Sequence, residues 1–146
     1  MPVRQVPWAR SALYVLCAGG LLTLTGCSRF KLYPVSGTAM LDGKPLTHCT
    51  VNFNPDASKG NTFPVSCVGK LDGQGHFKLR TLAVKASEGG PGAPLGWYKV
   101  TLLTNLPGEP EINVNPKYLD VNKTPLSVEI VENPQPGAYD LTLSNK

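Results

Sequence analysis

The sequence predicts an all-β fold, a single seven-stranded antiparallel β-sandwich that follows a cleaved signal peptide. The 15 glycines and 14 prolines among 146 residues, with only 16% charged residues, favour short strands and tight turns over a bundle of helices. The 41% of apolar residues is too high for a disordered chain and is enough for one modest core. Turn residues separate short apolar segments at the spacing typical of a sandwich.

The first 26 residues have the pattern of a secretory signal peptide. Arg4 and Arg10 precede an uncharged, mostly apolar run over residues 11–25. As a helix, about fifteen residues would span about 22 Å, short of the roughly 30 Å hydrocarbon layer. A basic start, a short apolar run and small residues at its end therefore indicate export and cleavage, not a membrane span.

The apolar run ends in Leu24-Thr25-Gly26-Cys27, which resembles the lipobox of bacterial lipoprotein precursors. The resemblance implies that the Cys27 thiol receives a diacylglyceryl group, that cleavage occurs before Cys27, and that the new amino group is often acylated. The thiol is the nucleophile for the thioether, and the small Thr25 and Gly26 allow close approach to an enzyme. Two other interpretations stay open: an ordinary signal whose Cys27 pairs with another thiol, and an uncleaved anchor helix.

Several acyl chains would hold the mature chain on a membrane, which is its expected partner. The lipobox resemblance implies an extracytoplasmic location. Bacteria that sort lipoproteins by the residue after the cysteine retain those with aspartate at the inner membrane, so Ser28 favours the outer membrane. Residues 27–34 are expected to form a lipidated tether, which reaches about 20–25 Å when extended. Its Arg29 and Lys31 either attract anionic headgroups or only keep the tether solvated.

The first four strands are expected over residues 35–41, 49–54, 65–71 and 77–79. After the first, Asp42-Gly43 supplies a tight turn. In the second, Cys49, Val51 and Phe53 alternate with polar residues, which is the period of a half-buried strand. Between the third and the fourth, Asp72-Gly73-Gln74-Gly75 supplies another hairpin-like turn.

The last three strands are expected over residues 97–104, 126–131 and 139–143. A loop rich in glycine and proline over residues 86–96 precedes the first of them, which is the strongest strand pattern in the chain. Three prolines over residues 106–124 indicate a long connection, and Pro134-Gln135-Pro136-Gly137 indicates a turn. No segment predicts a helix.

Three segments carry a resemblance to a known family: Val35–Thr38 with Leu41–Leu46, the Asp-x-x-Gly-x-Phe turn within Leu71–Phe77, and the Pro-x-Gly-x-Tyr-x-Val entry within Gly92–Val100. They resemble carboxypeptidase-regulatory-like domains, which are also described as transthyretin-like or prealbumin-like sandwiches. Asn115-Pro116-Lys117-Tyr118 fits the version in small lipoproteins of planctomycete-type bacteria. The resemblance implies this fold over residues 35–146 and a non-catalytic structural or protein-interaction role in the cell envelope.

The residues of these motifs favour structural roles. Their glycines occupy turn positions that need unusual backbone angles, and their aromatic and branched residues are expected in the core. The glycines are Gly43, Gly75 and Gly96, and the core residues are Phe77, Tyr98 and Val100.

The two histidines predict neither a metal site nor an active site. His48 is expected beside Cys49 on one strand, so their side chains would point to opposite faces. His76 follows a turn and is expected to face solvent. Zinc needs convergent ligands and a catalytic triad needs an oriented histidine. The chain is therefore expected to have no cofactor, no metal and no enzymatic activity.

Cys49 and Cys67 are the cysteines of the expected domain. Outside the cytoplasm an even pair favours a disulfide, here between two consecutive strands. A bridge closing about eighteen residues would contribute around 3 kcal/mol. The alternative is two buried free thiols that behave as small apolar residues.

The remaining candidates concern partners. Removal of Arg4 and Arg10 lowers the formal net charge from +4 to +2, too weak a surplus to indicate nucleic acid. The expected partner is an unknown envelope protein. The alternative function is a glycan- or small-molecule-binding module, for which Tyr118 and Tyr139 are the candidate ligand-facing aromatics and Trp97 is as well suited to the core.

Overall fold

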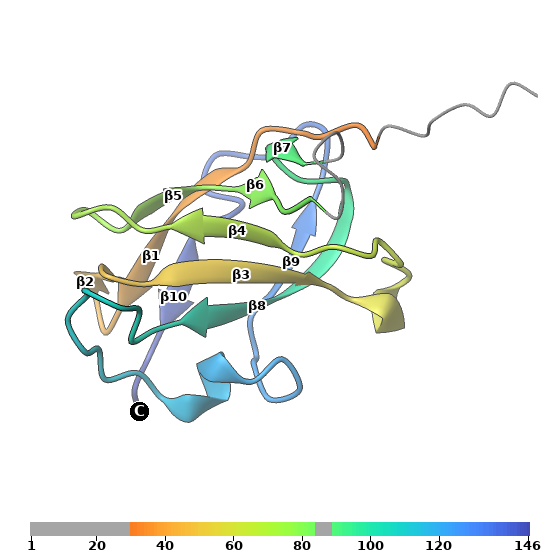
Figure 1. The fold of residues 1–146 in the computed structure, drawn as a ribbon. Helices are drawn as coiled ribbons and strands as arrows, with labels where there is room; N and C mark the ends of the chain where they lie inside the picture. Colours follow the sequence, from red (N-terminus) through yellow and green to blue (C-terminus); the bar gives the residue numbers. More distant parts are fainter. Residues whose placement is uncertain (1–29, 84–88) are drawn as a thin grey trace, which may run out of the picture.

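A computed structural model describes residues 30–83 and 89–146 of the chain (Figure 1). The predicted signal peptide over residues 1–26, with Leu24, Thr25 and Gly26 of its lipobox, and the lipidation site Cys27 lie outside these ranges. The described part is all-β, as predicted, and has two short 3-10 turns but no α-helix. None of its helical turns is long and apolar enough to cross a membrane.

The described ranges contain ten strands and two 3-10 helices. The strands are β1 (Ser36–Leu41), β2 (Lys44–Pro45), β3 (Thr50–Pro55), β4 (Cys67–Lys70), β5 (His76–Lys78), β6 (Arg80–Thr81), β7 (Gly90–Pro91), β8 (Gly96–Leu103), β9 (Ser127–Ile130) and β10 (Leu141–Leu143). The 3-10 helices are η1 (Ala57–Lys59) and η2 (Pro116–Leu119). Each of the seven predicted strands has a counterpart here. The three additional strands, β2, β6 and β7, have two residues each.

The strands form two sheets that face each other (Figure 1). One has six strands in the order β7-β6-β4-β3-β8-β9, all antiparallel to their neighbours. The other has four: β10, β1 and β2 in that order, with β5 also paired to β1. The prediction of a wholly antiparallel fold is wrong at one pair, because β10 runs parallel to β1 with Ala39 opposite Leu141. A crossover from β9 in the other sheet precedes β10, and such a connection permits parallel pairing where a tight hairpin does not.

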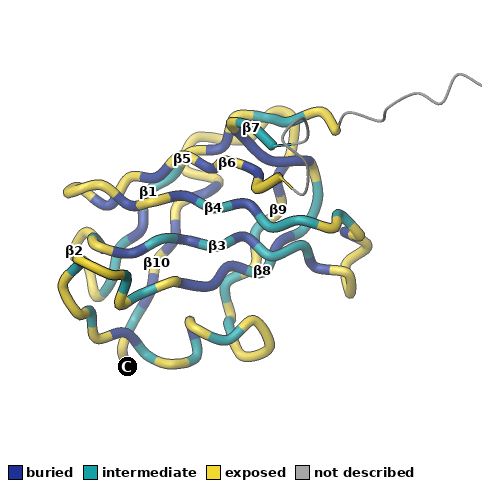
Figure 2. The backbone as a smooth tube through the Cα atoms, in the orientation of Figure 1, coloured by how far each residue is buried: buried dark blue, intermediate teal, exposed yellow. Residues whose placement is uncertain are grey.

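Both sheets contribute side chains to one hydrophobic core. The buried positions alternate along β3, as Figure 2 shows, and in β8 the apolar Tyr98, Val100 and Leu102 are buried at every second position, with Thr101 buried between the last two. This alternation follows from the two-residue period of a strand. The core residues from the six-stranded sheet include Val51, Phe53, Cys67, Tyr98 and Val100, and those from the four-stranded sheet include Ala39, Phe77, Leu141 and Leu143.

The turn residues take the backbone angles that the sequence predicts. Asp42 and Gly43 have φ of 48° and 79°, as in a two-residue hairpin turn between β1 and β2. Gly75 and Gly96 also have positive φ, of 77° and 132°. At Gly75 a side chain would meet the Ala39 carbonyl oxygen at 2.7 Å, so the close approach of β1 to the β4–β5 turn requires glycine.

The described part of the predicted tether, residues 30–34, lies against the domain. Tyr33 and Ala93 form an isolated β-bridge in which each backbone N–H donates to the other's carbonyl oxygen at 2.9 Å. The Phe30 ring meets the Phe63 ring edge-on, with centroids 4.5 Å apart. The Lys31 ammonium pairs with Glu132 at 3.1 Å. The folded part of the chain therefore begins no later than Phe30.

Candidate functional site

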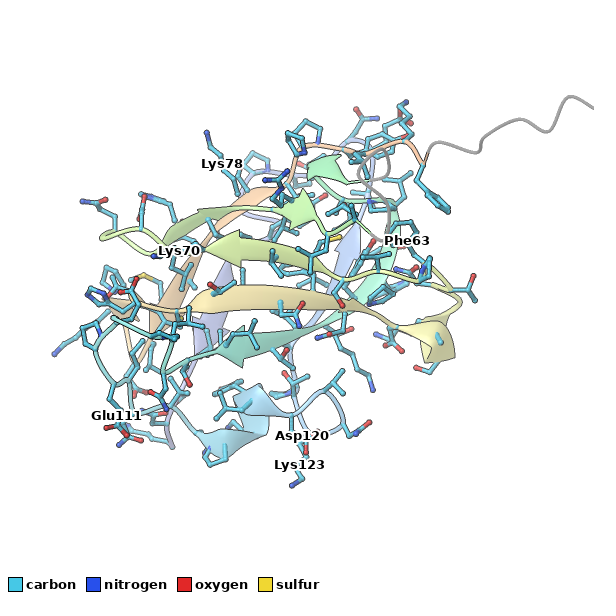
Figure 3. All side chains as sticks on the ribbon, viewed as in Figure 1. Phe63, Lys70, Lys78, Glu111, Asp120 and Lys123 are labelled. Atoms are coloured by element: carbon cyan, nitrogen blue, oxygen red, sulfur yellow. The ribbon has the colours of Figure 1, made fainter. Side chains whose placement is uncertain are left out.

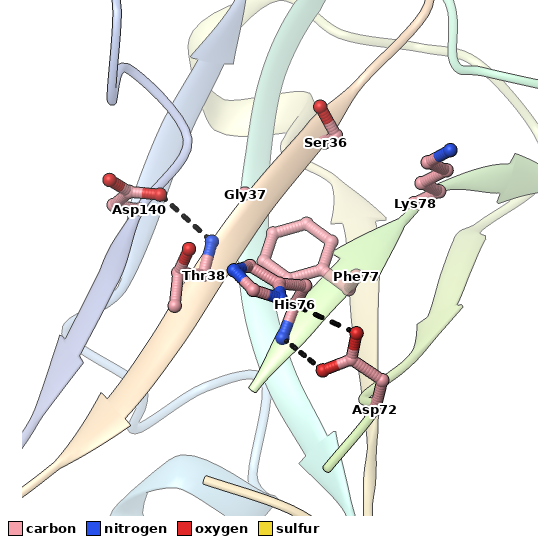
Figure 4. A pocket seen from close by; sticks show the side chains of 8 residues that line it. All are labelled: Ser36, Gly37, Thr38, Asp72, His76, Phe77, Lys78 and Asp140. Carbon is pink, nitrogen blue, oxygen red and sulfur yellow. Dashed lines mark hydrogen bonds and ion pairs between the residues drawn. The ribbon is translucent and has the colours of Figure 1, made fainter. Parts of the chain in front are cut away.

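A groove of about 480 Å³ lies on the outer face of the four-stranded sheet, where β5, β1 and the start of β10 are neighbours (Figure 4). It is open to solvent and has a mixed polar and apolar lining. Its lining residues are Ser36, Gly37, Thr38, Asp72, His76, Phe77, Lys78 and Asp140.

Strand register brings the polar side chains of the groove together. Thr38 pairs with His76 and Ser36 with Lys78, so these four side chains share the outer face of the sheet. Gly37 lies between the two β1 residues. A side chain there would overlap the Tyr139 backbone, with its Cβ 2.8 Å from the carbonyl carbon. The floor of the groove is therefore formed by closely spaced backbone.

Asp72 stabilises the turn between β4 and β5. Its Oδ1 accepts the backbone N–H groups of Gln74 at 2.8 Å and His76 at 2.9 Å, and its Oδ2 lies 3.4 Å from the His76 Nδ1 (Figure 4). The backbone N–H groups of His76 and Gln74 hold the pKa of Asp72 below its ordinary value. The carboxylate is thus an Asx-turn acceptor rather than a base directed at a ligand.

Asp140, on the other side of the groove, is also engaged by backbone. Its Oδ1 accepts the N–H of Thr38 at 2.8 Å (Figure 4). This bond attaches the residue before β10 to the middle of β1. His76 is largely exposed, as predicted, and lines the groove without being enclosed by it. The groove can therefore contact polar groups, and each of its two carboxylates also accepts a backbone N–H.

A second cluster of charges joins the loop before η2 to the end of β4. Glu109 accepts from the Lys70 ammonium at 2.6 Å through Oε1 and lies 2.9 Å from the His48 Nδ1 through Oε2. The hydrogen bond from the Lys70 ammonium holds the pKa of Glu109 below its ordinary value, and the contact with His48 lowers this pKa further. His48 lies before β3 with φ of +57°, not within the strand as predicted. Sequence reasoning missed this cluster because its members are far apart in the chain.

The aromatic side chains predicted to face a ligand are buried. The prediction is wrong for Tyr118 and Tyr139, each 4% exposed. The Tyr139 hydroxyl accepts the Val131 N–H and donates to the Val131 carbonyl, both at 3.2 Å. The Tyr118 hydroxyl accepts the Ser144 N–H at 3.0 Å and donates to its carbonyl at 3.2 Å. Each tyrosine therefore packs its ring in the core and hydrogen-bonds to loop or strand-end backbone.

Trp97 is partly exposed on the outer face of the six-stranded sheet. The Lys59 ammonium lies 3.8 Å from the centre of its ring and also donates to the Ser127 hydroxyl at 2.8 Å. A cation–π contact of this kind covers one face of the indole. Trp97 is therefore neither a core residue nor an open platform for a sugar ring.

The predicted disulfide between Cys49 and Cys67 is also wrong, because both thiols are free and buried. The register of β3 and β4 places Cys67 opposite Phe53, and the Leu71 N–H bonds to the Cys49 carbonyl. The two cysteines are thus separated by four residues along the strands, about 13 Å. Bridged cysteines have Cα atoms within about 7 Å. The sequence predicted the two cysteines in consecutive strands but carried no information on the register of those strands.

We expect both thiols to be unreactive in the folded protein. Burial raises the pKa of the Cys49 thiol to about 11, and burial likewise raises the pKa of Cys67. Because the thiolate is the reactive form, alkylation of these two residues should be at least about 100-fold slower than that of an exposed thiol introduced by Leu119→Cys. Peptide mapping after a timed pulse of reagent measures the difference. Denaturation without reductant should release both thiols, and a bridged peptide at that point would contradict the free state.

The described surfaces offer polar groups for contact with a partner. In residues 30–83 and 89–146, no three His, Cys, Asp or Glu side chains gather closely enough to hold a metal ion. No protein-family model, curated protein or solved structure matches the chain. The groove and the Glu109 cluster can each offer an imidazole and an ammonium group to a partner, from opposite sheets.

Proposed function

We propose that the chain is an extracytoplasmic bacterial lipoprotein whose β-sandwich, of transthyretin-like type, has a structural or protein-interaction role in the cell envelope. The signal peptide over residues 1–26 would be cleaved and Cys27 lipidated. The observation that carries the proposal is the closeness of the fold to the lipobox: Phe30, three residues after Cys27, already packs against the domain. Three residues reach at most about 11 Å. A domain that follows its cysteine so closely is suited to a position on the membrane surface.

The polar side chains of the domain support a non-catalytic role. Asp72 and Asp140 accept backbone N–H groups, and Glu109 pairs with Lys70 and His48. These carboxylates stabilise turns, loops and strand contacts. The glycan-binding alternative depended on exposed Tyr118 and Tyr139, which are buried, and we do not propose it.

The fold type is supported by the motifs that resemble carboxypeptidase-regulatory-like domains. The Asp-Gly turn joins β1 to β2, and the Asp-x-x-Gly-x-Phe turn joins β4 to β5 with Phe77 in the core. Tyr98 and Val100 are fully buried in β8. This placement of the motif residues in turns and in the core supports the proposed fold type.

The test is the intact mass and the N-terminal peptide of protein isolated from its host membranes. We expect a chain that begins at Cys27 and carries the mass of two or three acyl chains. In Cys27→Ser the acyl mass and the retention in the membrane fraction should be lost. Cys17→Ser, a cysteine within the predicted signal peptide, should behave like the unsubstituted protein. An unprocessed chain, or a mature chain without lipid, would contradict the proposal, and separation of the two membranes would test the preference for the outer one.

A further inference from the structure

Exposed apolar side chains gather at the end of the domain where the described chain begins. Four of the seven large hydrophobic residues that are exposed in the described ranges are Phe30, Leu82, Leu95 and Val131, at 49, 44, 42 and 37%. With the partly buried Phe63 they form a surface that we call the apolar end. Figure 3 shows Phe63 beside the point where the described chain starts.

Side-chain and backbone contacts hold the segments of the apolar end together. Phe30 packs on Phe63, and the Leu82 N–H bonds to the carbonyl of Ser66, three residues after Phe63. On the other side, Leu95 and Val131 directly adjoin Gly96 and Ile130, which are paired between β8 and β9.

Two further contacts connect these two groups. Tyr33 bridges to Ala93, two residues before Leu95. Lys31, next to Phe30, pairs with Glu132, next to Val131. The exposed apolar side chains therefore come from four separate parts of the sequence that are fixed to one another at one end of the fold.

The other three exposed hydrophobic residues lie elsewhere. Leu103 ends β8, and Leu119 and Val121 lie at and just after η2, which contacts β8. β8 begins beside Leu95, and its eight residues span about 25 Å. The η2 region thus lies alongside β8, whereas Leu95 precedes the start of that strand (Figure 1).

We propose that the apolar end is seated in the headgroup region of the membrane that carries the lipid on Cys27. This inference rests on the proposed function, because the lipid supplies the occupant: Phe30 is at most about 11 Å of chain from Cys27. Aromatic and aliphatic side chains partition favourably into the boundary between headgroups and acyl chains. The domain is therefore docked in one orientation, with β2 and the Glu109 cluster directed away from the bilayer.

The test uses one tryptophan at each end of the domain. In a Trp97→Phe background, Leu95→Trp and Leu119→Trp are matched substitutions at sites 42 and 45% exposed. The full chain, purified after processing in its host, is reconstituted into phosphatidylethanolamine–phosphatidylglycerol vesicles whose acyl chains carry bromine. We expect at least a twofold loss of fluorescence and a blue shift for Leu95→Trp. Leu119→Trp should keep its intensity and its solvent-exposed emission.

The outcomes separate the two proposals because the mass of the same samples reports the lipid. Equal quenching of both tryptophans, or of neither, in a chain that carries acyl mass would overturn the docking while leaving the lipoprotein proposal intact. The Leu95→Trp fluorescence could also stay unquenched in vesicles while being shielded from acrylamide in host membranes. That result would overturn the membrane docking, because a protein would then cover the apolar end. Loss of the acyl mass would overturn both. Thermal unfolding by circular dichroism checks that each variant is folded.

Discussion

Replacing Phe53 with alanine is expected to lower the free energy of unfolding by about 3–5 kcal/mol. Phe53 is fully buried in β3 of the six-stranded sheet. Its ring lies 5.9 Å from that of Phe77, on β5 of the other sheet, and 6.2 Å from that of Tyr98 on β8. The substitution therefore removes the ring that joins both sheets, and the cavity left behind has rigid strands on either side.

Urea unfolding followed by Trp97 fluorescence and by circular dichroism measures this loss. Leu119→Ala, at a position 45% exposed, is the control and should change the free energy of unfolding by less than about 0.5 kcal/mol. A Phe53→Ala protein that loses less than about 1 kcal/mol would mean that the two sheets do not share the core described here.

Replacing Gly92 with alanine is expected to cost about 2–4 kcal/mol and to release residues 30–34 from the domain. Gly92 has φ of +95°, and a Cβ there would collide with the Tyr33 carbonyl, 2.8 Å from its carbon atom. Its own N–H bonds to the Leu79 carbonyl at 2.8 Å, and its carbonyl accepts the Thr81 hydroxyl at 2.9 Å. Because these bonds fix Gly92, the segment that contains Tyr33 has to move.

Gly108→Ala is the matched control for the backbone angle. Gly108 has φ of +83° but no atom within 4 Å of its added Cβ, so it should cost only about 1–2 kcal/mol. Hydrogen exchange of the Tyr33 and Ala93 amides reports the bridge itself. Both amides should lose protection in Gly92→Ala and keep it in Gly108→Ala. Unchanged protection in Gly92→Ala would contradict the close packing of the two segments.

The sequence predicts the parts of the fold that depend on local chemistry. The alternation around Val51 and Phe53 predicts β3. The Asp42-Gly43 pair predicts the hairpin turn between β1 and β2. A strand of two residues, such as β6 or β7, shows no period and cannot be detected in this way. The parallel pairing of β10 with β1 depends on a crossover between sheets, for which adjacent residues carry no signal.

The candidate sites were harder to predict than the fold, for a related reason. The exposure of His76 follows from its place after a turn, and it is confirmed. The Glu109–His48 contact joins residues 61 apart, so only tertiary structure can show it. Tyr118 and Tyr139 have a polar group that suits either a ligand or the backbone, and their sequence neighbours do not distinguish these uses.

The parallel pairing of β1 and β10 determines how the domain would bear a pulling force. The strand nearest the proposed anchor starts at Ser36, and its neighbour ends at Leu143, at the opposite end of the pair. Tension between the membrane and a partner held at the C-terminus would therefore act along the strands. It would load the hydrogen bonds between them in shear, all at once, instead of peeling them apart singly. The Thr38–Asp140 and Asp42–Leu143 hydrogen bonds also join β1 to β10 and its flanking residues, so they would resist the same shear force.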